Sequence, residues 1–303
     1  MELCIQNLTK AYGTKVALEN FSYTFTPGVT AVLGPNGAGK SSTIKIMSGV
    51  LTPDSGTCVI NGRVPWKERT AHVQEIGVVF GQRSQLWWDV PVADSFELLR
   101  DIYRVDGAAY RKTLSRLTEL LDLGELLRTP ARQLSLGQRM RCEIAAALLH
   151  EPKILFLDEP TIGLDAVSKA AVRGFIRTLN KERGTTVILT THDMQDIEAL
   201  AERILLIGRG RILLDGTLDE LKRRRPAQRR LTVAYGGGAL PVVEGLTPLR
   251  DADGHAELLL DTGLLSVSEA VARISAQTEV KDLSVSGESV EELVVSLYRE
   301  YRI

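Results

Sequence analysis

The feature that most constrains this chain is a glycine-rich stretch near its start, which reads Gly-Pro-Asn-Gly-Ala-Gly-Lys-Ser over residues 34–41. It fits the pattern G-x-x-x-x-G-K-[ST] of a phosphate-binding loop. A polyphosphate is held by backbone N–H groups, and these converge only where glycines allow unusual backbone angles and close approach. Val29 to Leu33 reads as a buried strand in front of the loop, and apolar residues at helical spacing follow it. This context disfavours the alternative, a glycine-rich turn before an ordinary helix.

Three kinds of group in this loop are suited to phosphates. Lys40 would place a positive charge at the β- and γ-phosphates, and the hydroxyl of Ser41 is a ligand for Mg²⁺. The helix that begins here turns its positive end toward the anion. We also expect backbone contacts to the phosphates from Asn36, Gly37, Ala38 and Gly39.

Charge, cysteine content and hydrophobicity disfavour several classes of protein. Among the 303 residues, 37 Lys and Arg balance 38 Asp and Glu, so no global charge attracts nucleic acid. Cys4, Cys58 and Cys142 are widely spaced without a C-x-x-C pair, which disfavours a disulfide framework or a zinc site. No run approaches the ~18 apolar residues that cross a bilayer. We therefore expect a cytoplasmic protein without a nucleic-acid partner, which reaches a membrane only through another polypeptide.

Two carboxylates follow an apolar run in the middle of the chain. Ile154 to Leu157 suits a strand buried on both faces of a parallel sheet, and Asp158 and Glu159 come directly after it. Carboxylates at such a tip are costly unless a cation or a reaction uses them. In a chain with a phosphate-binding loop they predict a Mg²⁺ ligand and a base. An acidic surface turn is the alternative.

His192 comes just after the next predicted buried strand, Val187 to Thr190. A single histidine is more often structural than catalytic. Its expected place on the same sheet edge as Asp158, Glu159 and Lys40 favours a functional role.

Residues from Val92 to about His150 have helical periodicity and predict an inserted helical subdomain. Near its end stands Leu134-Ser135-Leu136-Gly137-Gln138, where a helix begins at a serine and makes an anion-ready terminus. The expected apolar faces comprise Phe96, Leu99, Ile102 and Tyr103 in one helix and Leu114, Leu117, Leu120 and Leu121 in another.

The last part of the chain restarts in small strands and two amphipathic helices. We predict strands over Leu231–Tyr235, Ala256–Asp261 and Lys281–Ser286, and helices over Ser266–Ala276 and Val290–Tyr301. Gly236-Gly237-Gly238 is expected to be a loop and not a second phosphate site, because no Lys-Ser pair and no helix follow it.

In this order, the motifs resemble those of the ATP-binding subunits of ATP-binding cassette (ABC) transporters over residues 1 to about 222. Tyr12, which we expect to lie in a polar loop between two strands, matches the position that stacks on adenine in that family. The other matching elements are, in chain order, the Walker A run Gly34 to Ser42, the Q-loop residue Gln82, the signature Leu134 to Gln138, the Walker B strand Ile154 to Glu159, the D-loop Gly163-Leu164-Asp165 and the switch histidine His192.

The resemblance implies an α/β fold of the P-loop NTPase type. We expect an ABC nucleotide-binding domain over residues 1–222, with a mixed or parallel sheet core, an antiparallel β subdomain and an inserted helical subdomain over about residues 83–150. A small C-terminal α+β domain is expected over residues 223–303.

The resemblance also implies hydrolysis of ATP with Mg²⁺ as a cofactor. Glu159 would orient or deprotonate the attacking water, His192 would contact the γ-phosphate, and Ser42 the α-phosphate. Asp158, Ser41 and Gln82 would bind Mg²⁺, and Gln82 would also take part in catalysis. Ser135, Gly137 and Gln138 would cap the ATP of a second copy, with Asp165 near the nucleotide, so that an isologous homodimer buries two nucleotides.

One residue departs from the family pattern. Leu136 takes the third position of the signature, where the family usually has glycine. Its side chain would narrow the approach to the γ-phosphate and so bears on ATP affinity and turnover. This variant, together with residues 82–88 and 160–165, resembles prokaryotic drug and viologen exporters of the ABC-2 branch.

The resemblance implies separate permease subunits of ABC-2 type in the membrane, with this chain on the cytoplasmic face, driving export of a hydrophobic or amphiphilic compound. Trp87 and Trp88 would dock a permease, or would pack inside the helical subdomain. Two other functions stay open, an importer subunit and a soluble ABC ATPase. The soluble type would carry tandem cassettes or a coiled-coil or zinc insert, which this sequence does not contain.

Overall fold

The computed structural model describes residues 2–81, 83–223, 228–238, 240, 242–287 and 290–301. The chain divides into two compact units, Met1–Thr217 and Leu218–Arg302. The boundary expected after residue 222 lies inside α8 (Leu218–Arg223), a helix of the second unit. As a limit between folding domains it stays a prediction.

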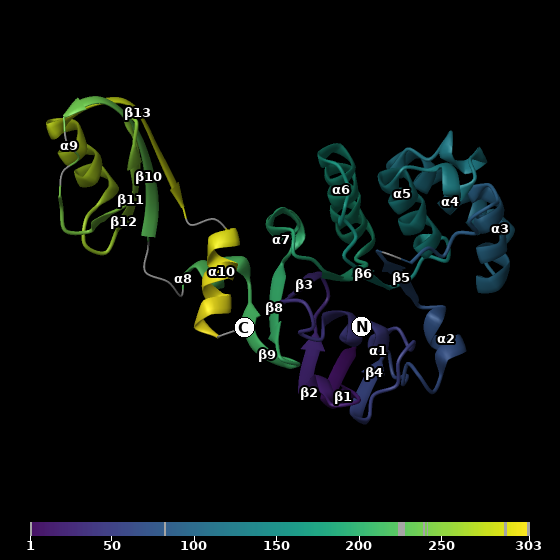
Figure 1. Cartoon of the computed structure of the whole chain (residues 1–303). Helices are drawn as coiled ribbons and strands as arrows, with labels where there is room; N and C mark the ends of the chain where they lie inside the picture. Colours follow the sequence, from purple (N-terminus) through teal and green to yellow (C-terminus); the bar gives the residue numbers. More distant parts are fainter. Residues whose placement is uncertain are drawn as a thin grey trace. The chain divides into compact units, whose positions relative to one another are not determined.

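A six-stranded sheet forms the centre of the first unit (Figure 1). Its strand order is β5-β6-β7-β3-β8-β9; the first five strands are parallel, and β9 runs antiparallel to β8. Val32 and Asp158 both pair with Thr190 of β7. The segments that follow β3, β6 and β7 therefore leave the sheet at one edge. The strands are β3 (Val29–Leu33), β5 (Ile76–Phe80), β6 (Ile154–Asp158), β7 (Thr186–Thr190), β8 (Arg203–Gly208) and β9 (Arg211–Gly216).

This sheet is buried on both faces, as its continuous apolar runs predict. In β6, Leu155 and Leu157 belong to a core cluster that includes the inserted helices. Ile154 and Phe156 of the same strand belong to a second cluster, with α1 (Lys40–Met47) and the N-terminal strands. Alternate side chains of one strand thus attach a helical layer and a β layer to the sheet.

An antiparallel sheet of order β2-β1-β4 provides that β layer. It consists of β1 (Leu3–Tyr12), β2 (Lys15–Phe25) and β4 (Ser55–Ile60), and α2 (Arg69–Val73) follows in the chain. Tyr12 pairs with Lys15 across a tight turn. The prediction that Tyr12 lies in a loop is therefore wrong, because the hairpin continues to the last residue before the turn.

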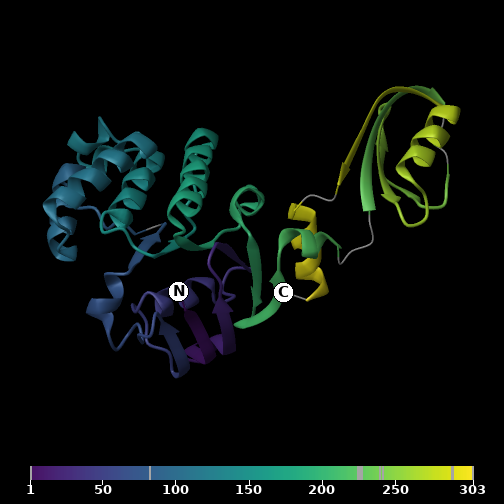
Figure 2. The same cartoon turned by 180° about the vertical axis from the view of Figure 1, so that it is seen from behind.

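The inserted region forms a helical group beside α6 (Ala166–Arg183) in both views (Figures 1 and 2). It contains α3 (Val92–Tyr103), α4 (Gly107–Leu121) and α5 (Leu136–Leu148), with short 3-10 turns η1 (Leu126–Arg128) and η2 (Ala131–Gln133); α7 (Met194–Leu200) follows β7. Asp106 caps α4 by accepting hydrogen bonds from the amides of Ala108 and Ala109, at 2.8 and 3.1 Å.

The predicted apolar faces of this group are only partly right. Phe96, Leu99 and Leu117 are buried, but Ile102 is 55% and Leu120 43% exposed. Ile102 lies off the buried stripe of α3. At about 100° per residue, six residues place its side chain roughly 120° around the helix from that of Phe96.

The second unit contains an antiparallel sheet of order β11-β12-β10-β13. Ala270 and Ile274 of α9 pack against Leu231 and Leu258 of this sheet. The elements are β10 (Gln228–Gly238), β11 (Leu246–Ala252), β12 (His255–Asp261), α9 (Val267–Gln277), β13 (Thr278–Gly287) and α10 (Val290–Glu300). Among the helices that the structure describes, none has both the length and the apolar character to cross a bilayer.

One expectation for this unit is wrong, and one of its strands was not predicted. Gly236 to Gly238 belongs to β10, where the ladder with β13 continues past a register shift between Tyr235 and Gly238; glycine weakens a strand but does not end it. β11 was not predicted, because most of its side chains are exposed and it lacks the alternation that indicates a half-buried strand.

Candidate active site

The phosphate-binding loop connects β3 to α1, and two of its glycines are required by close backbone approach. A Cβ atom at Gly34 would stand 2.2 Å from the carbonyl oxygen of Ile207, and one at Gly39 would stand 2.5 Å from that of Ala17. Gly39 also has a φ of 113°, in a region that side chains disfavour. The loop is therefore seated against β2 and β8, and its curvature needs glycine at these positions.

Lys40 begins α1 and is buried, with 6% of its surface exposed. Its ammonium donates hydrogen bonds to the carbonyl oxygens of Gly34, at 2.6 Å, and Pro35, at 3.1 Å. Burial lowers the pKa of Lys40, and the charges of Glu159 and Asp158 act in the opposite direction. The positive charge is thus held over the loop, at the start of a helix whose first amides have no carbonyl partner within the helix.

Asp158 ends β6 at the sheet edge from which the phosphate-binding loop leaves. Its Oδ1 accepts hydrogen bonds from the hydroxyls of Ser41, at 3.1 Å, and Thr190, at 2.5 Å. The register of β6 and β7 predicts that Asp158 and Thr190 are neighbours, but only the structure reveals the hydroxyl contact. Thr190 is a site residue that our sequence analysis did not identify.

Glu159 follows with a φ of 56°, a left-handed conformation that is unusual for a residue with a side chain and frequent at functional sites. Its amide donates to the carbonyl and hydroxyl oxygens of Thr190, at 3.0 and 3.1 Å. Its Oε2 lies 3.2 Å from Nε2 of His192. The strained turn thus fixes Glu159 beside the histidine, as its position in the sequence led us to expect.

Two adjoining clefts meet at these residues. The first, of about 210 Å³, is lined by Tyr12, Lys15, Gly39, Lys40 and Ser42. The second, of about 410 Å³, is lined by Lys45, Gly81, Arg83, Asp158 and His192. Asn36, Ser41 and Glu159 line both clefts. Gln82, expected to contribute to the second cleft, lies outside the described residues, between Gly81 and Arg83 that line it.

Tyr12 stands at the outer end of the first cleft, with 49% of its surface exposed. Its hydroxyl lies 3.4 Å from Oγ of Ser42. Lys15, across the hairpin, reaches the loop, since a Cβ atom at Gly37 would stand 3.0 Å from its Nζ. Lys15 was not among the predicted site residues. Ala38 is buried, and its amide bonds to the carbonyl of Pro35 at 3.1 Å.

The oxygen atoms around Ser41 fit a magnesium ion. Mg²⁺ prefers oxygen ligands and is usually held by one or two carboxylates together with substrate phosphates. The Ser41 hydroxyl and the Asp158 carboxylate lie together beside the loop. Within the described part of the chain, no cluster of three or more His, Cys, Asp and Glu side chains is able to hold a metal ion without such help.

The signature residues begin α5, and neither cleft has any of them in its described lining. Ser135 accepts a hydrogen bond from the amide of Gln138 at 3.2 Å, and the side chain of Gln138 accepts one from the amide of Ser135 at 2.9 Å. A Cβ atom at Gly137 would stand 2.3 Å from Oγ of Ser168. α5 and α6 therefore start in close contact.

Asp165 caps α6 by accepting hydrogen bonds from the amide and hydroxyl of Ser168, at 2.9 and 2.8 Å. The bond from that amide is the main cause that lowers the pKa of Asp165. Asp165 thus has a local structural role, because it stabilises the N-terminus of α6.

Trp87 and Trp88 are 43% and 51% exposed, so the alternative that they pack inside the helical subdomain is wrong. The guanidinium of Arg139 lies 5.5 Å from the ring centroid of Trp88. Beside them is a groove of about 260 Å³, whose lining includes Trp88, Leu136, Arg139 and Glu143.

Comparisons with known proteins point to one family. A family model described as "ABC transporter" matches residues 18–162. The daunorubicin resistance ATP-binding protein DrrA3 of Streptomyces coeruleorubidus is 32% identical over 97% of this chain and 95% of its own length. The linearmycin resistance ATP-binding protein LnrL of Bacillus subtilis (strain 168) is 30% identical over 95% of this chain and 93% of its own.

A solved structure of the ATP-binding cassette MJ0796, a dimer in a post-hydrolysis state with ADP and Pi, is also similar. Its TM-score is 0.65 at 27% identity, and the match covers 71% of this chain and 98% of that one. The α/β cassette fold and the nucleotide chemistry expected from the motifs are confirmed. The chain belongs to the ABC transporter family, as an ATP-binding subunit with ATPase activity.

Proposed function

We propose that this chain hydrolyses ATP to drive the export of a small hydrophobic or amphiphilic compound through separate permease subunits. The observation that carries the proposal is the convergence of Ser41, Asp158, Glu159 and His192 on one cleft beside the phosphate-binding loop. The resistance proteins among the relatives, named for daunorubicin and linearmycin, support export of a drug-like compound.

Phosphoryl transfer to water asks the protein mainly to position reactants and to stabilise spreading charge. Glu159 orients or deprotonates the attacking water, because its carboxylate stands where both clefts meet. His192 contacts the γ-phosphate and holds Glu159 in place across the 3.2 Å contact. Lys40 and the loop amides hold the β- and γ-phosphates, Ser42 touches the α-phosphate, and Tyr12 stacks on adenine.

Ser41 and Asp158 are the residues that would hold Mg²⁺, together with Gln82. When bound, the ion supplies charge neutralisation for the phosphates. The 3.1 Å contact between Ser41 Oγ and Asp158 Oδ1 places both ligand groups beside the loop before any ligand arrives.

A second copy of the chain completes the site in this proposal. Ser135, Gly137 and Gln138 start a helix whose end suits an anion, yet they stand away from both clefts of their own chain. In an isologous dimer each signature caps the nucleotide of the other copy, with Asp165 at the same interface. The dimeric cassette among the similar structures supports this arrangement.

A permease of ABC-2 type would dock at Trp87, Trp88 and the adjoining groove. Two exposed tryptophans side by side are typical of an interaction site, since they offer large apolar surface with little loss of side-chain entropy. Docking to such a permease would require the chain to act on the cytoplasmic face of a membrane. An importer subunit and a soluble ABC ATPase remain the alternatives, and the resistance proteins favour neither.

Transport in inside-out membrane vesicles tests the proposal. The chain is produced together with a candidate ABC-2 permease, and ATP-dependent accumulation of a fluorescent amphiphilic dye is recorded. We expect accumulation with the wild type and none with Glu159→Gln. Replacement of both Trp87 and Trp88 by Ala should abolish accumulation while ATP hydrolysis by the purified chain stays unchanged. Loss of dye from preloaded vesicles would indicate import, and hydrolysis without any movement of dye would contradict coupling to this permease.

A further inference from the structure

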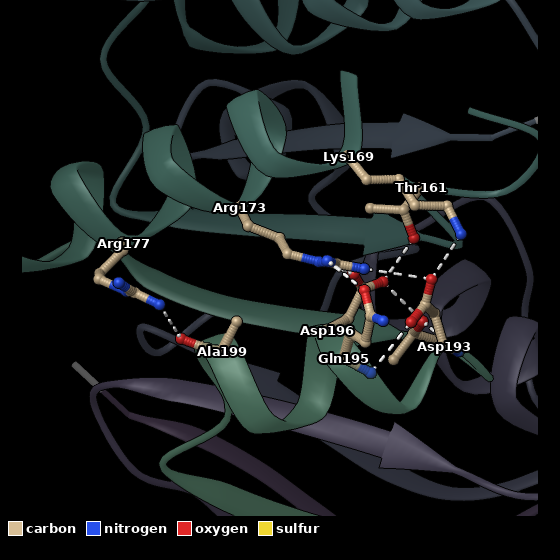
Figure 3. A network of polar contacts seen from close by, with 9 residues as sticks. Thr161, Lys169, Arg173, Arg177, Asp193, Gln195, Asp196 and Ala199 are labelled. Carbon is tan, nitrogen blue, oxygen red and sulfur yellow. Dashed lines mark hydrogen bonds and ion pairs between the residues drawn. The ribbon is translucent and has the colours of Figure 1, made fainter. Parts of the chain in front are cut away.

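A carboxylate of α7 lies within a network of polar contacts (Figure 3). Asp196, in α7, has 0% of its surface exposed. Its Oδ2 accepts hydrogen bonds from the hydroxyl of Thr161 at 2.5 Å and that of Thr191 at 2.8 Å. Its Oδ1 accepts one from Nε of Arg173 at 2.5 Å. Burial of a carboxylate is costly, and three hydrogen-bond donors compensate that cost here, unlike in an ion pair at the solvated surface.

The two threonines connect this carboxylate to the reacting groups. Thr161 stands two residues after Glu159, in the turn that leads to the D-loop, and Thr191 directly precedes His192. One oxygen atom of Asp196 thus holds the two chain segments that carry Glu159 and His192. Their side chains lie 3.2 Å apart, so a small shift of either segment would separate them.

Arg173 supplies the compensating charge from α6. Besides its bond to Asp196, its Nη2 lies 3.1 Å from Oδ2 of Asp193, and its Nη1 donates to Oε1 of Gln195 at 3.0 Å. The rigid fork of arginine suits this simultaneous contact with two carboxylates, whereas lysine offers a single point charge.

Asp193, directly after His192, receives a second cation from α6. Nζ of Lys169 donates to its Oδ2 at 2.6 Å. Burial acts to raise the pKa of Asp193, but the bonds from Lys169 and the Gln195 amide and the charges of Lys169 and Arg173 together lower it. α6 therefore holds the chain directly after His192, and Asp196 of α7 holds it directly before His192 through Thr191.

We propose that Asp196 and Arg173 are positioning residues for ATP hydrolysis, which lock the Glu159 turn and the His192 loop into one geometry. They contact no reacting group themselves. This inference rests on the proposed roles of Glu159 and His192. Misplacement of a catalytic group by about 1 Å can reduce a rate by about 100-fold, so a network that fixes two such groups is expected to control turnover.

Arg173→Lys and Asp196→Asn test the proposal, with Arg177→Gln as the matched control. Arg177, one turn further along α6, also ties α6 to α7, since its Nη2 donates to the carbonyl oxygen of Ala199 at 2.8 Å (Figure 3). It does not reach the His192 loop. We expect kcat to fall by about 10- to 100-fold in the two network variants, with KM for ATP raised by no more than about tenfold. The control should keep the kcat of the wild type.

A second readout separates positioning from general loosening of the fold. Because His192 is assigned to the γ-phosphate, the network variants should lose affinity for a non-hydrolysable ATP analogue by about threefold to tenfold and keep their affinity for ADP. A purely structural role would reduce both affinities together, or lower kcat in Arg177→Gln to the same extent, and either result would overturn the proposal.

Removal of a buried charge partner can prevent folding. If Asp196→Asn is not recovered as a folded protein, Thr161→Val removes one hydroxyl donor and keeps the shape of the side chain, and the same two readouts apply. Unchanged kcat in both Thr161→Val and Arg173→Lys would contradict the inference. A wild type that hydrolyses ATP and a Glu159→Gln variant that does not would leave the proposed function intact in that case.

Discussion

Two helices of this chain, α1 and α5, have N-termini suited to an anion, and they differ in how these N-termini are capped. α1 begins at Gly39, where no side chain caps the helix. Gly39 lines a cleft together with the buried Lys40 and with Ser41, the first two residues of the helix. α5 begins at Ser135, where a reciprocal pair of hydrogen bonds with Gln138 caps the helix from within.

The difference shows that the same helix-terminus chemistry can serve two purposes. An uncapped start leaves amide donors that a phosphate can satisfy, so part of the stability of α1 depends on its ligand. A capping box satisfies two donors within the chain, so the start of α5 does not depend on a ligand for its stability. The first is a binding site in itself, and the second is suited to complete a site on another molecule.

The largest effect should come from Glu159→Gln, which leaves both helix starts intact. Turnover should fall by at least about 100-fold, because the carboxylate that acts on water is lost. Affinity for ATP, measured by calorimetry, should change little, and an ATP-dependent dimer should persist in light scattering. Glu198→Gln, an exposed carboxylate of α7, is the control. Normal turnover in Glu159→Gln would remove Glu159 from its role.

Lys40→Ala tests phosphate binding at the N-terminus of α1, which has no side-chain cap. Loss of charge-assisted hydrogen bonds, worth about 1.5–3 kcal/mol each, should weaken ATP binding by about 10- to 100-fold, as read by equilibrium titration. Lys153→Ala serves as control, since the side chain of Lys153 is 69% exposed and lines neither of the two clefts at the phosphate-binding loop. Equal affinity in wild type and Lys40→Ala would contradict the assignment of the loop.

Ser135→Ala tests the capping box at the N-terminus of α5. Loss of the cap should lower the free energy of unfolding by about 1 kcal/mol, and turnover by about tenfold if Ser135 also caps the nucleotide of a second copy. Ser266→Ala is a sharp control, because Ser266 forms the same capping box with Glu269 in α9. It should destabilise the second unit to a similar extent without slowing hydrolysis. Identical turnover of the two variants would leave α5 with a structural role alone.

Leu136→Gly should have the smallest effect on ATP binding of these variants. It tests a single side chain at the N-terminus of α5. Leu136 is 36% exposed, and its Cδ2 would stand 2.9 Å from a Cβ atom at Gly163. Replacement by glycine should widen the approach to α5 and raise the affinity for ATP by about twofold to threefold, a change of less than 1 kcal/mol. Leu136→Ala separates the side chain from the added backbone freedom, and the measurement is the ATP dependence of hydrolysis. A fall in affinity in both variants would contradict the idea that the leucine narrows the site.

Elements that follow from short-range rules were predictable from the residues alone. The buried strand before Asp158 and Glu159 is a continuous apolar run, and the phosphate-binding loop is fixed by glycine positions that local backbone geometry demands. Parallel strands end at one edge, so the meeting of Asp158, Glu159 and His192 near Lys40 was predictable as well. Strands without a buried face were not, and β11 was missed for that reason.

The polar side chains that support the site became known only from the packing of distant segments. Thr190 bonds to Asp158 across two strands, and Arg173 reaches Asp196 from a different helix. The exposure of Trp87 and Trp88 was equally open, because apolar residues in a helical region can face a neighbour or the solvent. Hydrogen bonds between distant segments depend on how layers pack, and no local pattern of residue types encodes that arrangement.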